Sequence, residues 1–320
     1  LGYVISVIMI GFSILALWLA ARVMKGRDYA TLQKGGGALQ KRRLSAWESV
    51  LAYGWIALVL AVTLAPHVGI LLMSFAKVWS FSVLPDAYTL EHYATVFSDA
   101  SGMIGNTLLY CVLAAGLDVV LGTAIAYLIL RTRLPARQWL DWLASAALAI
   151  PTLVLAIGYL RLFKGVHVPL TDKLVIHSWV LIMLAYAVRR LPYALRSCMA
   201  ALQQVHVSLE EAAQSLGASR LSTIRRVVVP LMTGGILAGF VTSFITAAVE
   251  LSATLLLVST ESQAPMSLGI YLYMQSIAGR GPGAALGVLA VVVVGLGTYF
   301  SHRFVERSRV TTSTSIKAGA

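Results

Sequence analysis

Charged residues are scarce in this sequence of 320 residues, where Asp, Glu, Lys and Arg together account for only 12% of the positions. Soluble globular domains carry about 25% of such residues. Apolar residues, by contrast, make up 58% of the chain. These values exclude a soluble fold, and no polar stretch is long enough to bury a core of its own. The composition predicts an all-α polytopic membrane protein.

Cysteine is also nearly absent, since the chain has only Cys111 and Cys198. The predicted topology places them toward opposite faces of the membrane, which excludes a disulfide framework, and their spacing implies no metal site. A phosphate-binding Gly-x4-Gly-Lys-Ser/Thr string is missing as well, and the glycine-rich run 278–283 is interpreted as a flexible turn instead. No cofactor is expected in this chain, and any ATP hydrolysis coupled to it must occur in another protein.

Long apolar runs, in contrast, recur throughout the sequence. A helix needs about 20 apolar residues to cross a bilayer. Seven stretches meet this length, at 2–22, 50–75, 104–130, 139–163, 174–196, 228–258 and 283–304. We interpret 1–22 as the last helix of a preceding half and 23–46 as a cytoplasmic linker. Residues 47–307 then form a six-helix unit, which is followed by a cytoplasmic tail at 308–320.

The distribution of basic residues gives this topology its orientation. The formal net charge is +12, but 20 of the 25 Lys and Arg residues fall in alternate loops, which argues against a nucleic-acid partner. Arg189, Arg190 and Arg196 are counted with the loop between the fifth and sixth spans. Loops rich in Lys and Arg face the cytoplasm. The pattern therefore predicts a multi-pass protein of a bacterial cytoplasmic membrane, in contact with lipid.

One polar segment, residues 206–230, separates the fifth and sixth spans. Ser208 and Glu211 have the spacing of a capping box, which predicts a short helix that starts at Ser208. Gly217 permits a sharp stop, and Ser219 or Ser222 can cap a second helix that leads to Pro230. A helix–turn–helix along the membrane surface is expected. Read without further context, the segment is also compatible with a simple amphipathic connector.

The spacing within this segment resembles a motif of the permeases of binding-protein-dependent ABC importers. That motif reads Glu-Ala-Ala, three residues, Gly, nine residues, Ile, one residue, Leu-Pro. Here Glu211-Ala212-Ala213 is followed by Gly217, then by Val227 and by Val229-Pro230. The chain thus looks like this motif with two aliphatic substitutions.

The resemblance implies a coupling helix that docks in a groove of an ATPase subunit. Its residues would be Glu210, Glu211, Ala212, Ala213, Ser215, Leu216, Gly217 and Ala218. The implied partners are cytoplasmic ATPase subunits that hold ATP and Mg, a periplasmic solute-binding protein, and a second permease half or homologous permease. Over residues 45–310 the sequence also shows a weaker resemblance to one branch of these permeases. That branch serves ferric iron, 2-aminoethylphosphonate and similar small solutes. This similarity includes Leu84-Pro85, Ile150-Pro151 and Glu250-Leu251-Ser252-Ala253.

Polar residues within predicted spans are the candidates for a translocation pathway, because charges in a bilayer are rare and costly. The residues assigned to the pathway are Asp118, Pro151, Glu250 and Ser252. The alternative is that the polar ones only form hydrogen bonds between packed helices. Thr246, Ser252 and Thr254 are expected on the same helix as Glu250. Pro151 should break the fourth span, with Thr152 as the group that satisfies the freed backbone.

Two rival functions remain open from the sequence. An intramembrane enzyme would use Asp118, Glu250 and His177 as a polar cluster, although these residues have no recognised catalytic spacing. An ion channel would use the glycine-rich run near residue 280 as a filter, although that run repeats no carbonyl-ring pattern.

Overall fold

The computed structural model describes residues 44–79, 82–169 and 174–318, and six further residues between 8 and 22. Those six, which are Ile8, Gly11, Phe12, Leu15, Leu19 and Arg22, are helical and exposed. The remainder of the predicted first span 1–22 and almost all of the linker 23–46 lie outside the described residues.

Helices form most of the described chain, which contains no strand beyond two isolated bridges. The α-helices are α2 (Ala46–Phe75), α3 (Glu91–Asp99), α4 (Ser101–Arg131), α5 (Arg137–Ala149), α6 (Thr152–Leu162), α7 (Trp179–Gln204), α8 (Val207–Ser215), α9 (Arg220–Thr223), α10 (Val229–Ala248), α11 (Thr254–Leu257), α12 (Met266–Met274) and α13 (Arg280–Ala318). Short 3₁₀ turns η1 (Val175–His177) and η3 (Glu261–Gln263) and a π-helix, η2 (Ile224–Val228), connect them.

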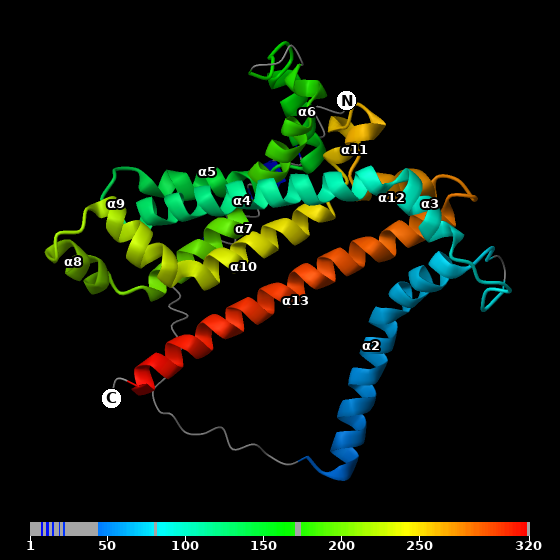
Figure 1. Ribbon diagram of the computed structural model, residues 1–320, viewed down its shortest axis with the longest axis horizontal. Helices are drawn as coiled ribbons and strands as arrows, with labels where there is room; N and C mark the ends of the chain where they lie inside the picture. Colours follow the sequence, from blue (N-terminus) through cyan, green and yellow to red (C-terminus); the bar gives the residue numbers. More distant parts are fainter. Residues whose placement is uncertain are drawn as a thin grey trace.

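The centre of the fold is a bundle in which α4, α7, α10 and α13 run side by side (Figure 1). α7 packs against both α4 and α10, and small residues permit the close approach. A Cβ atom added to Gly235 of α10 would lie 2.3 Å from Ala201 Cβ of α7, and one added to Gly239 would lie 3.2 Å from Ala194 Cα. Without a side chain, Gly235 and Gly239 allow the backbone of α10 to pack closely against α7.

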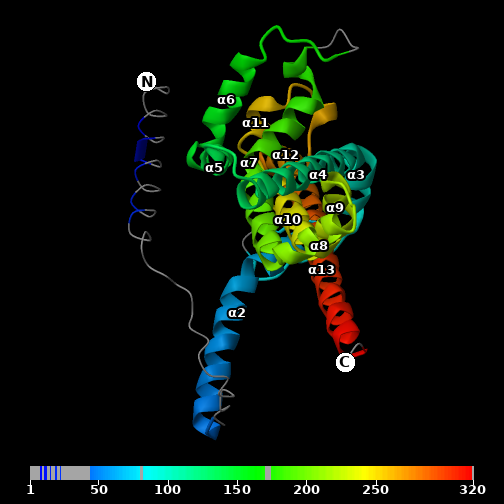
Figure 2. The ribbon, with the colours of Figure 1, turned by 90° about the vertical axis from the view of Figure 1, so that its left-hand side faces the viewer.

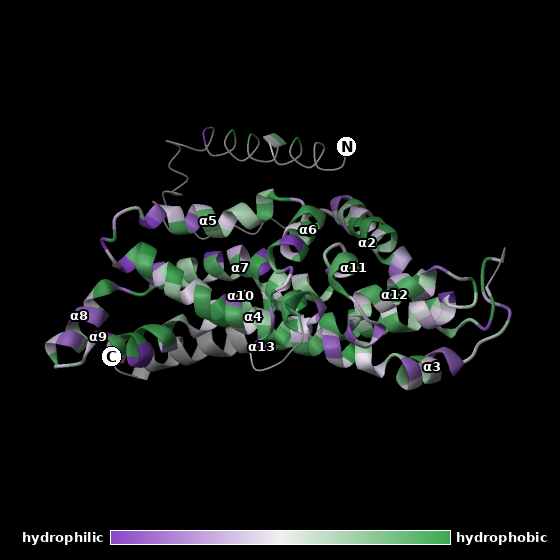
Figure 3. Ribbon diagram, turned by 90° about the horizontal axis from the view of Figure 1, so that it is seen from above, coloured by the Kyte–Doolittle hydropathy of each residue, from purple (hydrophilic) through white to green (hydrophobic). Residues whose placement is uncertain are grey.

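Polar and apolar residues are separated along the length of this bundle. Figure 3 shows hydrophilic residues on α8 and α9 at one end and on α3 at the other, with hydrophobic helix surface between them. α2, α4, the continuous segment Arg220–Ala248 and the first part of α13 are long and apolar enough to cross a membrane. The bundle therefore lies across the bilayer, with α8 at one surface and α3 at the other.

The predicted fourth span, 139–163, is not one straight helix. It is split into α5 and α6, and the chain bends by 108° between these two helices. α5 has 13 residues and is therefore about 20 Å long, shorter than the roughly 30 Å core of a bilayer. α6 rises away from the bundle in Figure 1.

The predicted fifth span, 174–196, also differs from the structure, because α7 extends from Trp179 to Gln204. Its length would allow it to cross the membrane, but it carries Arg189, Arg190 and Arg196. α4, α5 and α10 pack around it, and Arg190 is buried. The assignment of Arg189 and Arg190 to a cytoplasmic loop was therefore wrong, since both lie within α7.

The predicted sixth span, 228–258, ends early. α10 stops at Ala248, and the chain loses helical structure over 249–253 before α11 begins at Thr254. Glu250 and Ser252 consequently lie in a break between helices, and the expectation that they share one helix with Thr246 and Thr254 was wrong.

α2 and α13 pack against each other over part of their length and then diverge (Figure 2). Among the residues of α2, only Ser74 is buried, and most apolar side chains along the helix are exposed. α13 continues through residue 308, so the expected boundary between the permease unit and its tail falls within a helix.

Candidate functional site

The polar segment 206–230 forms two short helices at the end of the bundle, as the sequence predicted. α8 begins at Val207, one residue earlier than expected, and its N-cap is His206 rather than Ser208. The His206 ring accepts a hydrogen bond from the Ser208 backbone N–H at 3.3 Å. Ser208 is already helical, and its side chain contacts His206 Nδ1 at 2.8 Å. The predicted capping box therefore does not form.

The end of α8 and the start of the next helix agree with the prediction. Gly217 has a φ of +89°, a conformation that is costly for residues with a Cβ. Ser219 caps α9 by accepting a hydrogen bond from the Ser222 N–H. The chain then continues without interruption through η2 into α10. The π-helix, which includes Val227 of the motif, was not predicted. Such turns are frequently found at functional sites.

The two adjacent glutamates of α8 have different environments. Glu210 is buried and accepts a hydrogen bond from Arg131 Nε at 2.7 Å. The same guanidinium donates to the carbonyls of Leu202 and Val205 at the end of α7, at 3.0 and 2.5 Å. Arg131 is the last residue of α4. A single side chain thus joins α4, α7 and α8, a connection that sequence reasoning missed.

The remaining predicted coupling residues lie mostly on the surface. Glu211, Ala212, Ser215, Leu216 and Gly217 are exposed, and Ala213 and Ala218 are half-buried. Leu216 is 90% exposed. Leu216 lies close in sequence to the exposed carboxylate of Glu211 and next to Gly217, whose φ is positive. Together these residues form a small exposed surface with both apolar and charged groups.

A buried ion pair between Arg190 and Glu250 lies at the helix break that follows α10. Arg190 of α7 contacts Glu250 Oε2 at 2.5 Å and donates to the carbonyl of Thr246 at 2.8 Å. The Glu250 backbone carbonyl accepts hydrogen bonds from Thr254 and Ser267. Glu250 therefore binds α7 and α12 to the point where α10 ends.

Arg189, the residue before Arg190, binds the backbone at the break between α5 and α6. Arg189 donates to the carbonyls of Ala147 and Ile150, both at 2.6 Å. These carbonyls lie at the end of α5, immediately before Pro151. The freed backbone groups are thus satisfied by Arg189, and the expectation that Thr152 would do so was wrong. Two consecutive arginines of α7 therefore bind the backbone or side chains at both helix breaks, the one between α5 and α6 and the one after α10. The charges of Arg189 and Arg190 inside a predicted span were the signal that sequence reasoning overlooked.

Asp118 is fully buried in α4, where its Oδ2 accepts a hydrogen bond from Ser243 of α10. Its other carboxylate oxygen, Oδ1, has no hydrogen-bond partner, nor does the buried Arg190 Nε. Arg190 interacts electrostatically with Asp118. The structure thus places the predicted pathway residues Asp118 and Glu250 around one arginine.

The other predicted pathway residues occupy different environments. Pro151 is half-buried as the N-cap of α6, whereas Ser252 is exposed in the turn after Glu250. His177 is exposed in η1, away from the buried setting of Asp118 and Glu250. Within the described ranges, no group of three His, Cys, Asp or Glu residues is placed to hold a metal ion. This arrangement gives no support to the alternative of a catalytic cluster.

Comparison with known proteins agrees with this architecture. Residues 118–310 match the family described as "Binding-protein-dependent transport system inner membrane component". The solved structure of a bacterial ABC transporter involved in the import of alginate is similar, with a TM-score of 0.61 at 17% identity. It covers 82% of this chain and 98% of the other.

Two curated relatives illustrate the range of functions. The ferric transport system permease protein FbpB of Actinobacillus pleuropneumoniae is 28% identical over 236 residues, which are 72% of this chain and 33% of that protein. The sulfate transport system permease protein CysT of Salmonella typhimurium is 32% identical over 143 residues, 43% of this chain and 52% of that protein. The chain thus spans about a third of the first relative and about half of the second.

Proposed function

Because the chain belongs to the family of binding-protein-dependent transport system inner membrane components, we propose that it acts as one permease half of an ATP-driven importer. Its relatives are permeases, not enzymes, and like them it is a multi-pass protein of the inner membrane. The solute would be delivered by a periplasmic binding protein and would pass between two permease halves.

The observation that carries this proposal is the attachment of α8 to the bundle. Arg131 joins α8, through Glu210, to the ends of α4 and α7. α8 is joined to α10 through α9 and η2. A displacement of α8 would therefore be transmitted to three bundle helices as a rigid-body movement. A coupling helix needs this combination of a fixed inner face and an exposed outer face.

The exposed tip of the segment suits an ATPase subunit as the partner. Glu211 offers a carboxylate, Leu216 an apolar anchor, and Gly217 a close approach of the backbone. ATP and Mg would be held by that partner, and the nucleotide-driven movement would reach this chain through α8. Glu211 and Gly217 are the residues on which coupling should depend most.

A second permease half is required because one bundle provides only one side of a pathway. α2 has almost no buried residue in the single chain, and its exposed surface includes Trp47, Tyr53 and Trp55. This surface would be covered by lipid together with the other half, whether that half belongs to the same polypeptide or to another one.

For the solute we propose ferric iron. The relative named for ferric transport aligns with 72% of this chain, compared with 43% for the sulfate permease. The alternative of 2-aminoethylphosphonate rests on the sequence pattern alone. Asp118 and Glu250 are the proposed carboxylates of the pathway. A movement of the Arg190 side chain between them would leave one or the other carboxylate free to contact the solute.

The proposal can be tested with a reconstituted transporter. A Leu216→Cys variant should cross-link to the ATPase subunit, whereas Phe97→Cys, an exposed position on α3 at the opposite end, should not. Cys111 and Cys198 are buried and will react little. Uptake of radiolabelled ferric iron into vesicles should exceed that of sulfate. Absence of the Leu216 cross-link would refute the coupling role, and preferential sulfate uptake would refute only the solute.

A further inference from the structure

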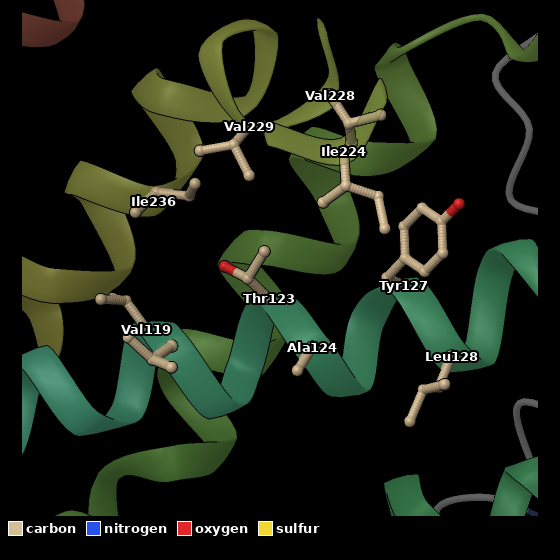
Figure 4. A pocket seen from close by; sticks show the side chains of 10 residues that line it. Val119, Thr123, Ala124, Tyr127, Leu128, Ile224, Val228, Val229 and Ile236 are labelled. Atoms are coloured by element: carbon tan, nitrogen blue, oxygen red, sulfur yellow. The ribbon is translucent and has the colours of Figure 1, made fainter. Parts of the chain in front are cut away.

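An open groove of about 520 Å³ lies on the side of the bundle between α4 and the π-helix η2 with α10 (Figure 4). Its lining residues are Val119, Val120, Thr123, Ala124, Tyr127, Leu128, Ile224, Val228, Val229 and Ile236. Neither Arg190 nor Glu250 of the buried ion pair lines this groove, and neither do the exposed residues of α8.

The groove lining is almost entirely aliphatic. The only polar side chains are those of Thr123 and Tyr127, and both are engaged elsewhere. Thr123 contacts the Cys198 thiol at 3.4 Å, and the Tyr127 hydroxyl donates to Glu210 at 3.3 Å. A charged solute would find no hydrogen-bonding partner in this groove. The chemistry suits a hydrocarbon chain instead.

The length of the groove along α4 matches the thickness of the hydrocarbon core of one leaflet. It extends along α4 from Val119 to Leu128, about 14 Å at the rise of an α-helix. Half of a bilayer core is about 15 Å. α4 ends at Arg131, beside α8. The groove therefore lies in the leaflet on the α8 side, which the basic loops identify as the cytoplasmic leaflet.

Positive charge collects where the groove reaches the membrane surface. Arg220, Arg225 and Arg226 are exposed on α9 and η2, and Arg220 interacts electrostatically with Tyr127 of the groove lining. The sequence contains no acidic residue between Glu211 and Glu250. Arg131 is neutralised by Glu210, so these three arginines provide the excess charge. An apolar groove below an unneutralised basic rim is complementary to a lipid with an anionic headgroup.

We propose that this groove binds an acyl chain of an anionic phospholipid from the cytoplasmic leaflet, with the phosphate held by Arg220 and the neighbouring arginines. Ile224 and Val228 belong to η2, the turn that connects α9 with α10, so the bound chain contacts the segment that links α8 to the bundle. Lipid binding would stabilise this π-helix and thereby favour transmission of movement from α8. The proposal depends on the cytoplasmic position of α8 and holds whichever solute is carried.

The test uses the assembled transporter in vesicles that contain equal amounts of phosphatidylglycerol and phosphatidylcholine with identical acyl chains. After extraction, native mass spectrometry measures the lipids that remain bound. Wild type should retain phosphatidylglycerol preferentially. Arg220→Gln should reduce the bound ratio about fivefold, the effect of one basic residue near an anionic headgroup. Arg133→Gln serves as the matched control and should leave the ratio unchanged, because Arg133 is also exposed but, unlike Arg220, is not among the charges that act on Tyr127 of the groove lining.

A second pair of variants separates the groove from the surface charge. Ala124 is exposed within the groove, so Ala124→Trp should fill the space and displace the lipid without disturbing the core. Leu109→Trp, an exposed position toward the other end of α4, should have no effect. The proposal is overturned if both lipids are retained equally, if Arg220→Gln and Arg133→Gln behave alike, or if Val120→Cys cross-links to the second permease half, which would make the groove a protein interface.

Discussion

Arg190 and Glu250 form an ion pair at 2.5 Å between the middle of α7 and the break that follows α10. Both residues are buried. Removing one partner of a buried pair leaves an uncompensated charge, which is more costly than removing both. The pairing explains how a chain poor in charge keeps an arginine inside its bundle.

Glu250→Gln should destabilise the purified transporter by about 3 kcal/mol, measured as a lower midpoint of thermal unfolding. The double variant Arg190→Met with Glu250→Leu should recover most of that loss, because neither charge then remains buried. The pair Arg196–Asp141, in which the arginine is exposed and the aspartate half-buried, is the control, and Asp141→Asn should cost less than about 1 kcal/mol. Equal effects of Glu250→Gln and Asp141→Asn would show that the buried pair contributes little.

The two glutamates of α8 should have separable roles. Glu210→Gln weakens the contact with Arg131, so we expect a less stable transporter and faster proteolysis near residues 206–219. Glu211→Gln should leave stability within about 0.5 kcal/mol, because surface substitutions are usually that mild, but should reduce ATPase activity stimulated by the binding protein. Unfolding curves and ATPase assays on both variants test this. The same loss of stability in both variants would contradict the division of roles.

The left-handed conformation of Gly217 should make it sensitive to any side chain. Gly217→Ala is expected to cost about 1 kcal/mol, and Gly217→Asn less, because Asn tolerates this conformation. Gly234 provides the comparison, since it is helical and a Cβ there would meet no atom within 4 Å. Gly234→Ala should be neutral or slightly stabilising. Thermal unfolding of the three variants distinguishes backbone strain from loss of contacts, and a neutral Gly217→Ala would argue against strain.

The bend at Pro151 should depend on Arg189 as well as on proline. Because Arg189 occupies the carbonyls of Ala147 and Ile150, Pro151→Ala alone should leave the bend in place. Combining Pro151→Ala with Arg189→Met should allow α5 and α6 to straighten. Spin labels at the exposed positions Leu143 and Leu162 would report the change as a longer distance in the double variant only. A longer distance in Pro151→Ala itself would assign the bend to proline.

The local structure of the polar segment 206–230 was largely predictable because its signals are local. Gly217 and Ser219 act through their own backbone and the nearest turn, so sequence spacing sufficed to place them. The prediction of Ser208 as the N-cap of α8 was wrong for a similarly local reason. His206 is a less common N-cap residue, and the Ser208–Glu211 spacing favoured the wrong start. The separate roles of Glu210 and Glu211 could not be inferred, because only the position of Arg131, far away in sequence, distinguishes them.

The sequence by itself determined that this protein is a bundle of membrane-spanning helices, which face carries the basic loops, and where the polar segment lies. Those features follow from hydrophobicity and local backbone preference, which each residue expresses regardless of its distant neighbours. Only the tertiary structure decided that α7 lies inside the bundle despite its arginines, that Arg189 and Arg190 close two helix breaks, and that a groove forms beside η2. The physical reason is that a buried charge is tolerated only when its partners are brought to it, and those partners come from helices that are remote in sequence.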